Sequence, residues 1–225
     1  MLTSCASKKK EVEIIAPNEL YERAMNNLKK DRPEEAAKDF ERLEAENPFS
    51  EYSSRSIIMA AYSYYYAGEY DDSLLIVDYI KKTSFENLDY IYYLEVLNKY
   101  EKFKKAKKDL DLAKDLYKTT CITLDKFPNS IYSGDLEKKR EILLENIAKK
   151  EFNIVKLYIK EGNLIGSINH LREILGNYPD NEYTPQALYT MYALYRHIGY
   201  DFGIKFYNGL LRNKYPDSQM IKYLK

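Results

Sequence analysis

The side chains best suited to catalysis or metal binding are two histidines and several acidic pairs. His170 and His197 could hold a metal or act as a general base, but we expect them in different helical hairpins with no cysteine nearby. The pairs Glu34–Glu35 and Asp71–Asp72 fall where helices are expected to begin, and the positive end of the helix dipole explains them without catalysis. The serines have no paired base, and no glycine-rich phosphate loop occurs. We therefore predict that the protein is not an enzyme and has no metal site and no cofactor.

The two cysteines are predicted to have different roles. Cys5 follows Leu2-Thr3-Ser4, which resembles a bacterial lipobox, so we expect a lipidated cysteine at the head of a flexible tether, residues 1–16. Acyl chains at about 0.8 kcal/mol per buried methylene would then anchor the protein to a membrane. The alternative is an ordinary N-terminal tail, because no basic and apolar leader precedes the motif. Cys121 lies in a helical stretch and is predicted to be a small core thiol.

Composition narrows the classes of partner. The chain carries 35 basic and 35 acidic residues, so it has no net field to attract a polyanion, and nucleic acid is not an expected partner. It has no tryptophan but 24 tyrosines, which bury a ring while their hydroxyls stay in water. Tyrosines of this kind are typical of half-buried helix faces and protein-binding surfaces. No apolar run approaches the roughly 18–20 residues of a membrane-spanning helix.

Helices must position these side chains, because apolar residues recur at intervals of three and four, as in Ile154, Leu157 and Tyr158, and do not alternate as in strands. Gly162 and Gly199 stand at the same distance before a proline, and such a repeated offset indicates a structural repeat. These glycines are expected to take a left-handed conformation in the turn between two helices, as is Gly68.

A small residue, an aromatic residue and a proline recur at the spacing of a tetratricopeptide helical hairpin. Ala36, Phe40 and Pro48 match this template. The small residue lets two helices approach, the aromatic ring fills the groove between hairpins, and the proline ends the second helix. Pro33 is expected to start that second helix. The predicted fold is all-α, a right-handed superhelix of about five tetratricopeptide hairpins.

The predicted solenoid covers residues 17–225. Its parts are an N-terminal group of repeats (17–87), an irregular middle repeat (88–132) and a C-terminal group (133–225). In the first part, Ser50 is expected to cap a helix, and Phe85 replaces the terminating proline. In the middle repeat a bend is expected at Glu101 to Lys108. In the C-terminal group a long helix is predicted from Gly134 to Glu161.

The first helix of each stacked hairpin should line a concave groove. Counting from the template, the groove-facing positions of the second hairpin are Arg55, Ile58, Tyr62, Tyr65 and Tyr66, and those of the fifth are Tyr189, Ala193, Arg196 and His197. Tyrosine and arginine are common interface anchors, and a tyrosine-lined groove with one arginine would suit an extended, aromatic-rich peptide with a free carboxylate. The alternative is that the tyrosines pack between helices. We favour packing for Tyr64 and leave both possibilities open for Tyr62 and Tyr66.

An ordered set of motifs gives the sequence a likeness to a known family. After the lipobox come Leu-Tyr-x-x-Ala (20–24), Ala-Ala-x-x-Phe (36–40), Tyr-Ser-Tyr-Tyr-Tyr-x-Gly-x-Tyr (62–70), Asp-Tyr-x-Tyr-Tyr (89–93), Phe-Pro-Asn-Ser-x-Tyr (127–132), Tyr-x-x-x-Gly (158–162), Ile-Asn (168–169), Asn-Tyr-Pro-Asp (177–180) and Ala-Leu (187–188). Together these motifs resemble the BamD (ComL) family, tetratricopeptide lipoproteins of the machine that assembles outer-membrane β-barrels.

The resemblance implies a non-catalytic scaffold, lipid-anchored through Cys5 at the periplasmic face of a Gram-negative outer membrane. Its N-terminal repeats, with Arg55, Tyr62 and Tyr66, would hold unfolded outer-membrane proteins. Its C-terminal repeats, with Tyr189, Tyr195 and Arg196, would dock on a periplasmic POTRA domain of the barrel-forming subunit. Accessory lipoproteins are possible further partners.

Two alternatives stay open at this point. One is another envelope lipoprotein with such repeats, serving cell-wall or pilus assembly. The other is a cytosolic co-chaperone or adaptor, which would apply if Met1 is the true start.

Overall fold

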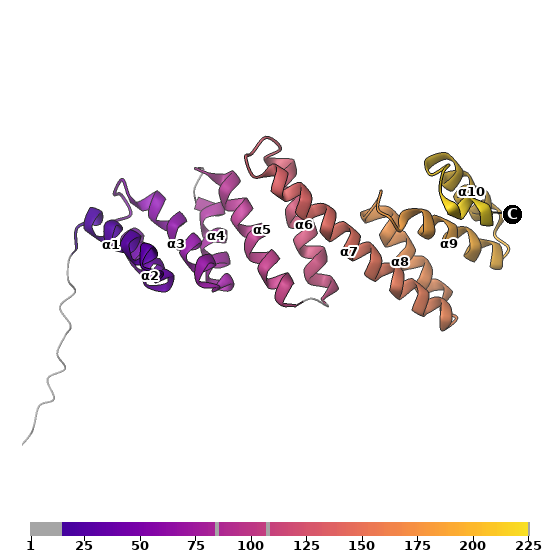
Figure 1. Cartoon of the computed structure of the whole chain (residues 1–225), viewed down its shortest axis with the longest axis horizontal. Helices are drawn as coiled ribbons and strands as arrows, with labels where there is room; N and C mark the ends of the chain where they lie inside the picture. Colours follow the sequence, from indigo (N-terminus) through magenta and orange to yellow (C-terminus); the bar gives the residue numbers. More distant parts are fainter. Residues whose placement is uncertain (1–14, 84–85, 107–108, 225) are drawn as a thin grey trace, which may run out of the picture. The chain divides into compact units, whose positions relative to one another are not determined.

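A computed structural model describes residues 15–83, 86–106 and 109–224 of the chain (Figure 1). These residues form ten α-helices and one short 3-10 helix, and they contain no strand, which confirms the predicted all-α class. The right-handed sense of the superhelix stays a prediction. The helices are α1 (Pro17–Lys29), α2 (Pro33–Glu46), α3 (Ser53–Ala67), α4 (Tyr70–Thr83), α5 (Leu88–Lys105), α6 (Leu110–Lys126), α7 (Ser133–Lys160), α8 (Leu164–Asn177), α9 (Thr184–His197), α10 (Asp201–Lys214) and the 3-10 helix η1 (Gln219–Tyr223).

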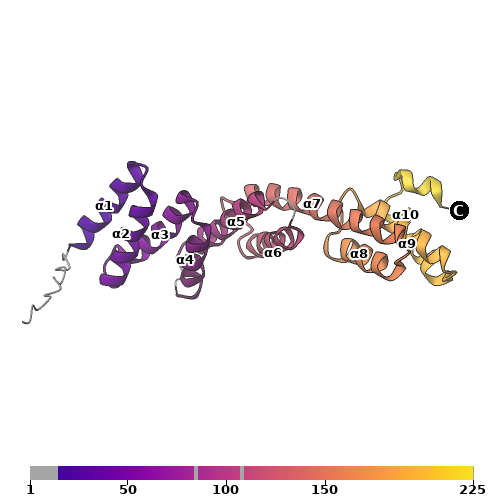
Figure 2. The same ribbon diagram turned by 90° about the horizontal axis from the view of Figure 1, so that it is seen from below.

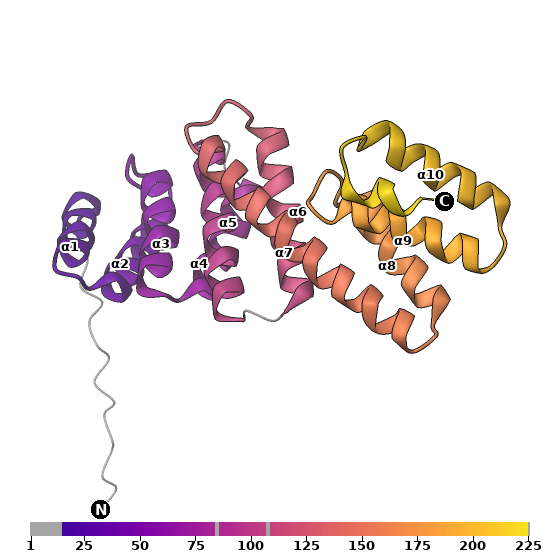
Figure 3. The same cartoon turned by 45° about the vertical axis from the view of Figure 1, so that its right-hand side comes forward.

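The chain divides into two compact units, which we call the N-terminal unit (Met1–Asn98) and the C-terminal unit (Lys99–Lys225). The division falls inside α5. In the N-terminal unit α1 to α4 pack as successive neighbours, which Figures 2 and 3 show from two further directions. In the C-terminal unit each helix from α6 to α10 likewise packs on the next, and η1 lies against α9.

The core of the N-terminal unit follows the repeat template. Ala36 and Ala60 are fully buried, and their small side chains let α2 and α3 approach closely. Phe40 is also fully buried, and its ring meets Tyr21 edge-on at a centroid distance of 5.5 Å. The predicted roles of Ala36 and Phe40 in the first hairpin therefore agree with their positions in the structure.

A chain of buried hydrogen bonds joins three helices of this unit. The Ser73 hydroxyl on α4 donates to the carbonyl of Ala61 on α3 at 2.8 Å. The same oxygen accepts a bond of 2.9 Å from the amide of Asn98 on α5. Because Ser73 and Asn98 are fully buried and have no access to water, these bonds give their polar groups partners within the protein.

The turns between helices follow the glycine pattern, with one correction. Gly68, Gly162 and Gly199 have φ angles of 83°, 74° and 71°, in the left-handed region that glycine adopts without strain. The expectation that Ser50 caps α3 is wrong, because the helix begins at Ser53 and no side-chain cap is present. The Ser50 carbonyl accepts from the Ser53 N–H at 3.1 Å, so a backbone turn takes the place of the cap.

The C-terminal unit contains the predicted long helix and a buried charge. Helix α7 has 28 residues and matches the expected range from Gly134 to Glu161. In its interior the carboxylate of Glu151 has no exposed surface and lies 2.6 Å from Lys114 Nζ and 2.5 Å from His170 Nδ1. These two partners come from α6 and α8, so Glu151 ties three helices together. Helix α5 continues to Lys105, so residues 101–105 of the range predicted for the bend before α6 are helical, and residues 107–108 lie outside the described residues.

Candidate functional site

Four of the five predicted substrate-groove side chains lie along one strip of α3, on which Arg55 and Tyr66 are exposed and Ile58 and Tyr62 are half-buried. Arg55, Ile58, Tyr62 and Tyr66 follow one another at helical spacing of three and four residues. From Arg55 to Tyr66 the strip spans roughly 16 Å at about 1.5 Å per residue. That length matches roughly five residues of an extended peptide at about 3.3 Å each. We call Arg55, Ile58, Tyr62 and Tyr66 the α3 strip.

A small pocket marks the end of the strip at the beginning of α3. Its volume is about 200 Å³, and its walls include Arg55, Ile58 and Met59 of α3 together with Glu86 and Asn87 before α5. Arg55 is exposed, and no acidic side chain of the described residues pairs with it. The pocket wall also contains Glu51 and Glu86, and the Arg55 guanidinium, which forms no ion pair with them, is suited to a carboxylate that is attached to an apolar group.

The other end of the strip is a pair of tyrosine rings. Tyr62 and Tyr66 stack with their centroids 6.3 Å apart and their planes 5° apart. The Tyr66 side chain is 53% exposed, and its hydroxyl donates to Asp31 in the α1–α2 turn at 3.1 Å. This bond raises the pKa of Tyr66 above its ordinary value. The hydroxyl is therefore protonated at neutral pH, and Asp31 fixes the direction of the ring.

Tyr65 and Tyr64 lie away from the strip. Tyr65 is half-buried against the core of the N-terminal unit, and its ring meets that of Tyr70 at 6.1 Å. Tyr64 is also half-buried, as favoured from the sequence, and its hydroxyl donates to Glu41 at 2.7 Å. Burial and this bond raise the pKa of Tyr64. Ile58 stands at the border, partly packed on the same core.

The predicted docking residues of α9 occupy two different faces. Arg196 and His197 are exposed at the end of the helix, and Arg196 has no ion-pair partner among the described residues. Tyr189 is partly buried, and its ring contacts Tyr223 of η1 at 5.9 Å. Tyr195 points toward α10, where it stacks on Tyr207 at 5.5 Å. Tyr195 therefore packs inside the last hairpin, and Arg196 and His197 are the accessible members of the predicted set. Ala193 is partly buried on the side of Tyr189.

Cys121 is not the buried core thiol that we expected. It is half-buried and lines a pocket of about 490 Å³ beside α6 and α8. The expectation failed because helical periodicity gives the side of a helix but not how completely the neighbouring helix covers it. Cys5 with its lipobox, and Phe85, lie outside the described residues.

Sequence reasoning also missed several polar residues. The α3 pocket includes Glu86 and Asn87, which lie far along the chain from α3, and no sequence signal pairs them with Arg55. The sequence analysis assigned no role to Glu151. Its spacing of four residues from the buried Ile147 and Val155 is the signal that would have placed it on the inner face of α7.

Two further features of the described residues bear on function. No cluster of three or more histidine, cysteine or acidic side chains is arranged to hold a metal ion in residues 15–83, 86–106 and 109–224. Across the same residues, each helix is either too short or too polar to cross a bilayer.

Comparison with known proteins identifies the family. The model of a family described as YfiO, outer membrane lipoprotein, matches residues 14–205. The chain belongs to this family. This match agrees with the resemblance to the BamD family that the ordered motifs indicated, and curated relatives also confirm that resemblance.

Curated relatives named outer membrane protein assembly factor BamD align with most of the chain. The protein of Rickettsia prowazekii (strain Madrid E) is 29% identical over 229 residues, covering 99% of this chain and 90% of the relative. That of Caulobacter vibrioides is 24% identical and covers 96% of this chain and 72% of the relative. That of Neisseria meningitidis serogroup B is 25% identical, with coverages of 90% and 80%.

Among solved structures, PilW, described as a widely conserved type IV pilus biogenesis factor, aligns with a TM-score of 0.38. The identity is 12%, and the alignment covers 92% of this chain and 97% of PilW. At this level of likeness the alignment supports no conclusion about fold or function.

Proposed function

We propose that this member of the YfiO family is a non-catalytic assembly factor that binds outer-membrane proteins before they fold, and that it works at the periplasmic face of the outer membrane through a lipid on Cys5. The observation that carries the proposal is the α3 strip. There an unpaired guanidinium and two stacked tyrosines, of which Tyr62 is half-buried and Tyr66 exposed, lie along one helix face. Relatives named as outer membrane protein assembly factors support the setting in which such a strip would act.

The α3 strip suits an extended peptide that ends in a carboxylate after an aromatic residue. Arg55 would pair with the carboxylate, and the neighbouring pocket would take the last side chain. The Tyr62–Tyr66 stack would contact side chains farther along the peptide, because aromatic rings add contact area at little cost in side-chain entropy. The peptide carboxylate would supply the ion-pair partner that Arg55 does not have among the described residues, although Glu51 and Glu86 line the same pocket.

A second contact is proposed at the end of α9. Arg196 is exposed and unpaired within the described residues, so an acidic residue of a partner can reach it without breaking a bond of this protein. The partner that we propose is a periplasmic POTRA domain of the barrel-forming subunit, with accessory lipoproteins as further members of the complex. A rim charge of this kind contributes to orientation and association rate more than to raw affinity.

Peptide binding tests the α3 strip directly. A fluorescein-labelled decapeptide that ends in Tyr-x-Phe with a free carboxylate should bind the full chain, and amidation of its terminus should weaken binding about tenfold, since a charged hydrogen bond is lost. Arg55→Gln should weaken the acid peptide to the level of the amide peptide and leave the amide peptide unchanged. Tyr66→Ala should weaken both.

The control is Tyr79→Ala, which removes an exposed tyrosine of α4 outside the strip and should change neither affinity. Equal binding of the acid and amide peptides, or wild-type affinity of Arg55→Gln for the acid peptide, would contradict the proposal that the α3 strip binds a peptide carboxylate.

Photo-crosslinking in cells tests whether the two contacts serve different partners. A photoreactive residue at Tyr62 is expected to capture unfolded outer-membrane proteins, and one at Arg196 the barrel-forming subunit. A photoreactive residue at Lys205, exposed on α10, is the control position. Recovery of a murein synthase at both positions would contradict the proposed function.

A further inference from the structure

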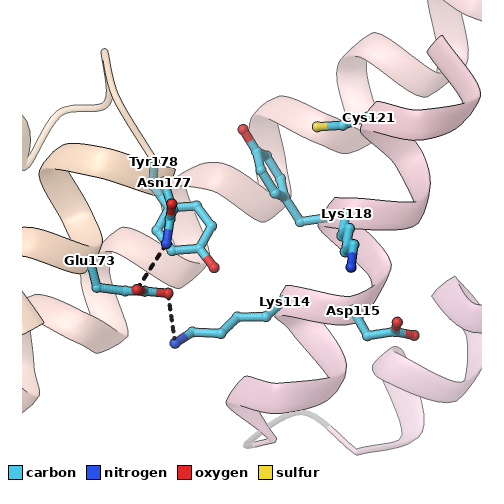
Figure 4. Close-up of a pocket in the computed structure, with 8 residues that line it drawn as sticks. Lys114, Asp115, Lys118, Cys121, Glu173, Asn177 and Tyr178 are labelled. Atoms are coloured by element: carbon cyan, nitrogen blue, oxygen red, sulfur yellow. Dashed lines mark hydrogen bonds and ion pairs between the residues drawn. The ribbon is translucent and has the colours of Figure 1, made fainter. Parts of the chain in front are cut away.

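A pocket beside α6 and α8, within the C-terminal unit, is not used by the proposed function (Figure 4). Its volume is about 490 Å³, enough for two amino-acid side chains. We call it the α6–α8 pocket. Its walls are Lys114, Asp115, Tyr117, Lys118 and Cys121 of α6, Glu173 and Asn177 of α8, and the following Tyr178.

The aromatic wall of the pocket contains a tyrosine hydroxyl that forms no hydrogen bond with the described residues. The Tyr178 residue is only 5% exposed, and its ring meets Tyr117 edge-on at 5.4 Å. Figure 4 shows the Tyr178 hydroxyl directed into the pocket, where the charges of Lys114 and Glu173 act on it. Burial raises the pKa of Tyr178 to about 12, so the group is a proton donor at neutral pH. A hydroxyl at a pocket wall that no described residue accepts from is available to a ligand that carries an acceptor.

The charges around the pocket leave a cation free. Asp115 pairs with Lys99 at 2.9 Å, and Glu173 pairs with Lys114 at 3.3 Å and accepts from Asn177 at 2.9 Å. Lys114 also forms an ion pair with the buried Glu151 at 2.6 Å. Lys118 is exposed at the pocket and has no ion-pair partner among the described residues.

A second cation, which is not one of the lining residues, acts on two of the residues that line the pocket. The positive charge of Arg140 on α7 acts on both the Tyr117 hydroxyl and the Cys121 thiol and lowers their pKa, although burial is the larger effect and raises both. Arg140 likewise has no ion-pair partner in the part of the chain that the structure describes. Asp125 also acts on Cys121 and opposes Arg140, but with the pocket carboxylates already paired, the two cations Lys118 and Arg140 outnumber it, so the unmet charge around the aromatic wall is positive.

We propose that the α6–α8 pocket binds an acidic segment of a partner polypeptide, in which an Asp or Glu side chain neighbours an aromatic one. The carboxylate accepts a hydrogen bond from the Tyr178 hydroxyl and pairs with Lys118, while the aromatic ring packs on Tyr117. Charge complementarity selects this occupant, because a basic segment would face two unpaired cations. The α6–α8 pocket shares no residue with the α3 strip and does not include Arg196. Experiments can therefore support the proposed pocket and contradict the proposed function, or support the function and contradict the pocket.

Cys121 provides a reporter inside the pocket. In the full chain with Cys5→Ser it is the one remaining cysteine, because the sequence has two. The rate of its alkylation by iodoacetamide is measured with millimolar acetyl-Ser-Phe-Glu-Gly-Ser-amide, and with the same peptide carrying Gln or Lys in place of Glu. The Glu peptide should slow alkylation in a saturable way, while the Gln peptide should bind about tenfold more weakly and the Lys peptide should give no protection.

Two variants separate the proposed contacts from packing. Tyr178→Phe removes only the unpartnered hydroxyl, so the protein should fold as before, and its affinity for the Glu peptide should fall about fivefold or more. Lys118→Met should weaken the Glu peptide to the level of the Gln peptide. Lys126→Met, on the same helix but outside the pocket, is the matched control and should leave affinity unchanged.

The proposal is overturned by any of three results. These are equal protection by the Glu and Gln peptides, no protection by any peptide, and wild-type affinity in Tyr178→Phe. A further arm uses acetyl-Ser-Phe with a free carboxylate. If only that peptide protects Cys121, the occupant is a chain terminus and the internal acidic segment is wrong.

Discussion

A glycine in the last hairpin gives a sharp test of how α9 and α10 pack. Gly203 is buried in α10, and a Cβ atom at this position would lie 2.6 Å from Cγ of Tyr195 and 2.8 and 2.9 Å from its two Cδ atoms. Ordinary contacts between carbon atoms are about 3.5–4.0 Å, so the ring would have to move by roughly 1 Å. It has little room, because Tyr207 stacks on it at 5.5 Å and Tyr200 contacts it at 5.5 Å.

The expected free-energy change for Gly203→Ala combines two opposing effects. Alanine favours the helix by about 1 kcal/mol over glycine. Overpacking costs about 1–3 kcal/mol, and disturbing the stacked tyrosines costs about 1 kcal/mol more. We therefore expect a net loss of stability of about 1–3 kcal/mol.

The matched control is Gly209→Ala in the same helix. A Cβ atom at Gly209 would meet nothing within 4 Å, so this variant keeps the helix-propensity gain without a clash. It should be more stable than the wild type by roughly 0.5–1 kcal/mol. The two variants should therefore differ by about 2–4 kcal/mol although their chemistry is the same.

Equilibrium unfolding in guanidinium chloride, followed by circular dichroism at 222 nm, measures both free energies. Near-ultraviolet circular dichroism reports separately on the tyrosine stack, and only Gly203→Ala should change it. Equal stabilisation by both alanines would refute the close approach of Tyr195 to α10. It would also reopen the possibility that Tyr195 is available to a partner.

Three further outcomes are expected. Ser73→Ala should lower the free energy of unfolding by about 1–2 kcal/mol, because the buried Asn98 amide loses a partner, and an unchanged denaturation midpoint would argue against that link. Lys114→Met should cost about 3 kcal/mol and more than Glu151→Gln, because it leaves a buried carboxylate with His170 as its remaining partner; the reverse order in thermal melts would contradict this. Burial raises the pKa of Cys121, so less thiolate is present at pH 7–8 than for a free cysteine, and the alkylation rate of Cys5→Ser should still be rising above pH 9, whereas a plateau below pH 8.5 would count against it.

The sequence by itself determined the class of the fold and most of its turns. Helical spacing of apolar residues, Pro33 at a helix start and the left-handed Gly68 and Gly199 are local features, because they depend on the backbone preferences of a few neighbouring residues. The residues of the α3 strip could also be predicted from the sequence, since residues three and four apart share a helix face in any context. The ordered motifs indicated the family because they are short local patterns that can be read directly along the chain.

Only the tertiary structure decided which of these side chains are free. Tyr195 and Arg196 are adjacent in the chain, yet Tyr195 is packed against α10 and Arg196 is exposed. Cys121 lines a pocket because α8 does not cover it fully. Glu151 is buried, and its partners Lys114 and His170 come from two other helices. Coverage by a neighbouring helix depends on contacts between residues far apart in sequence, and periodicity within one helix carries no information about them.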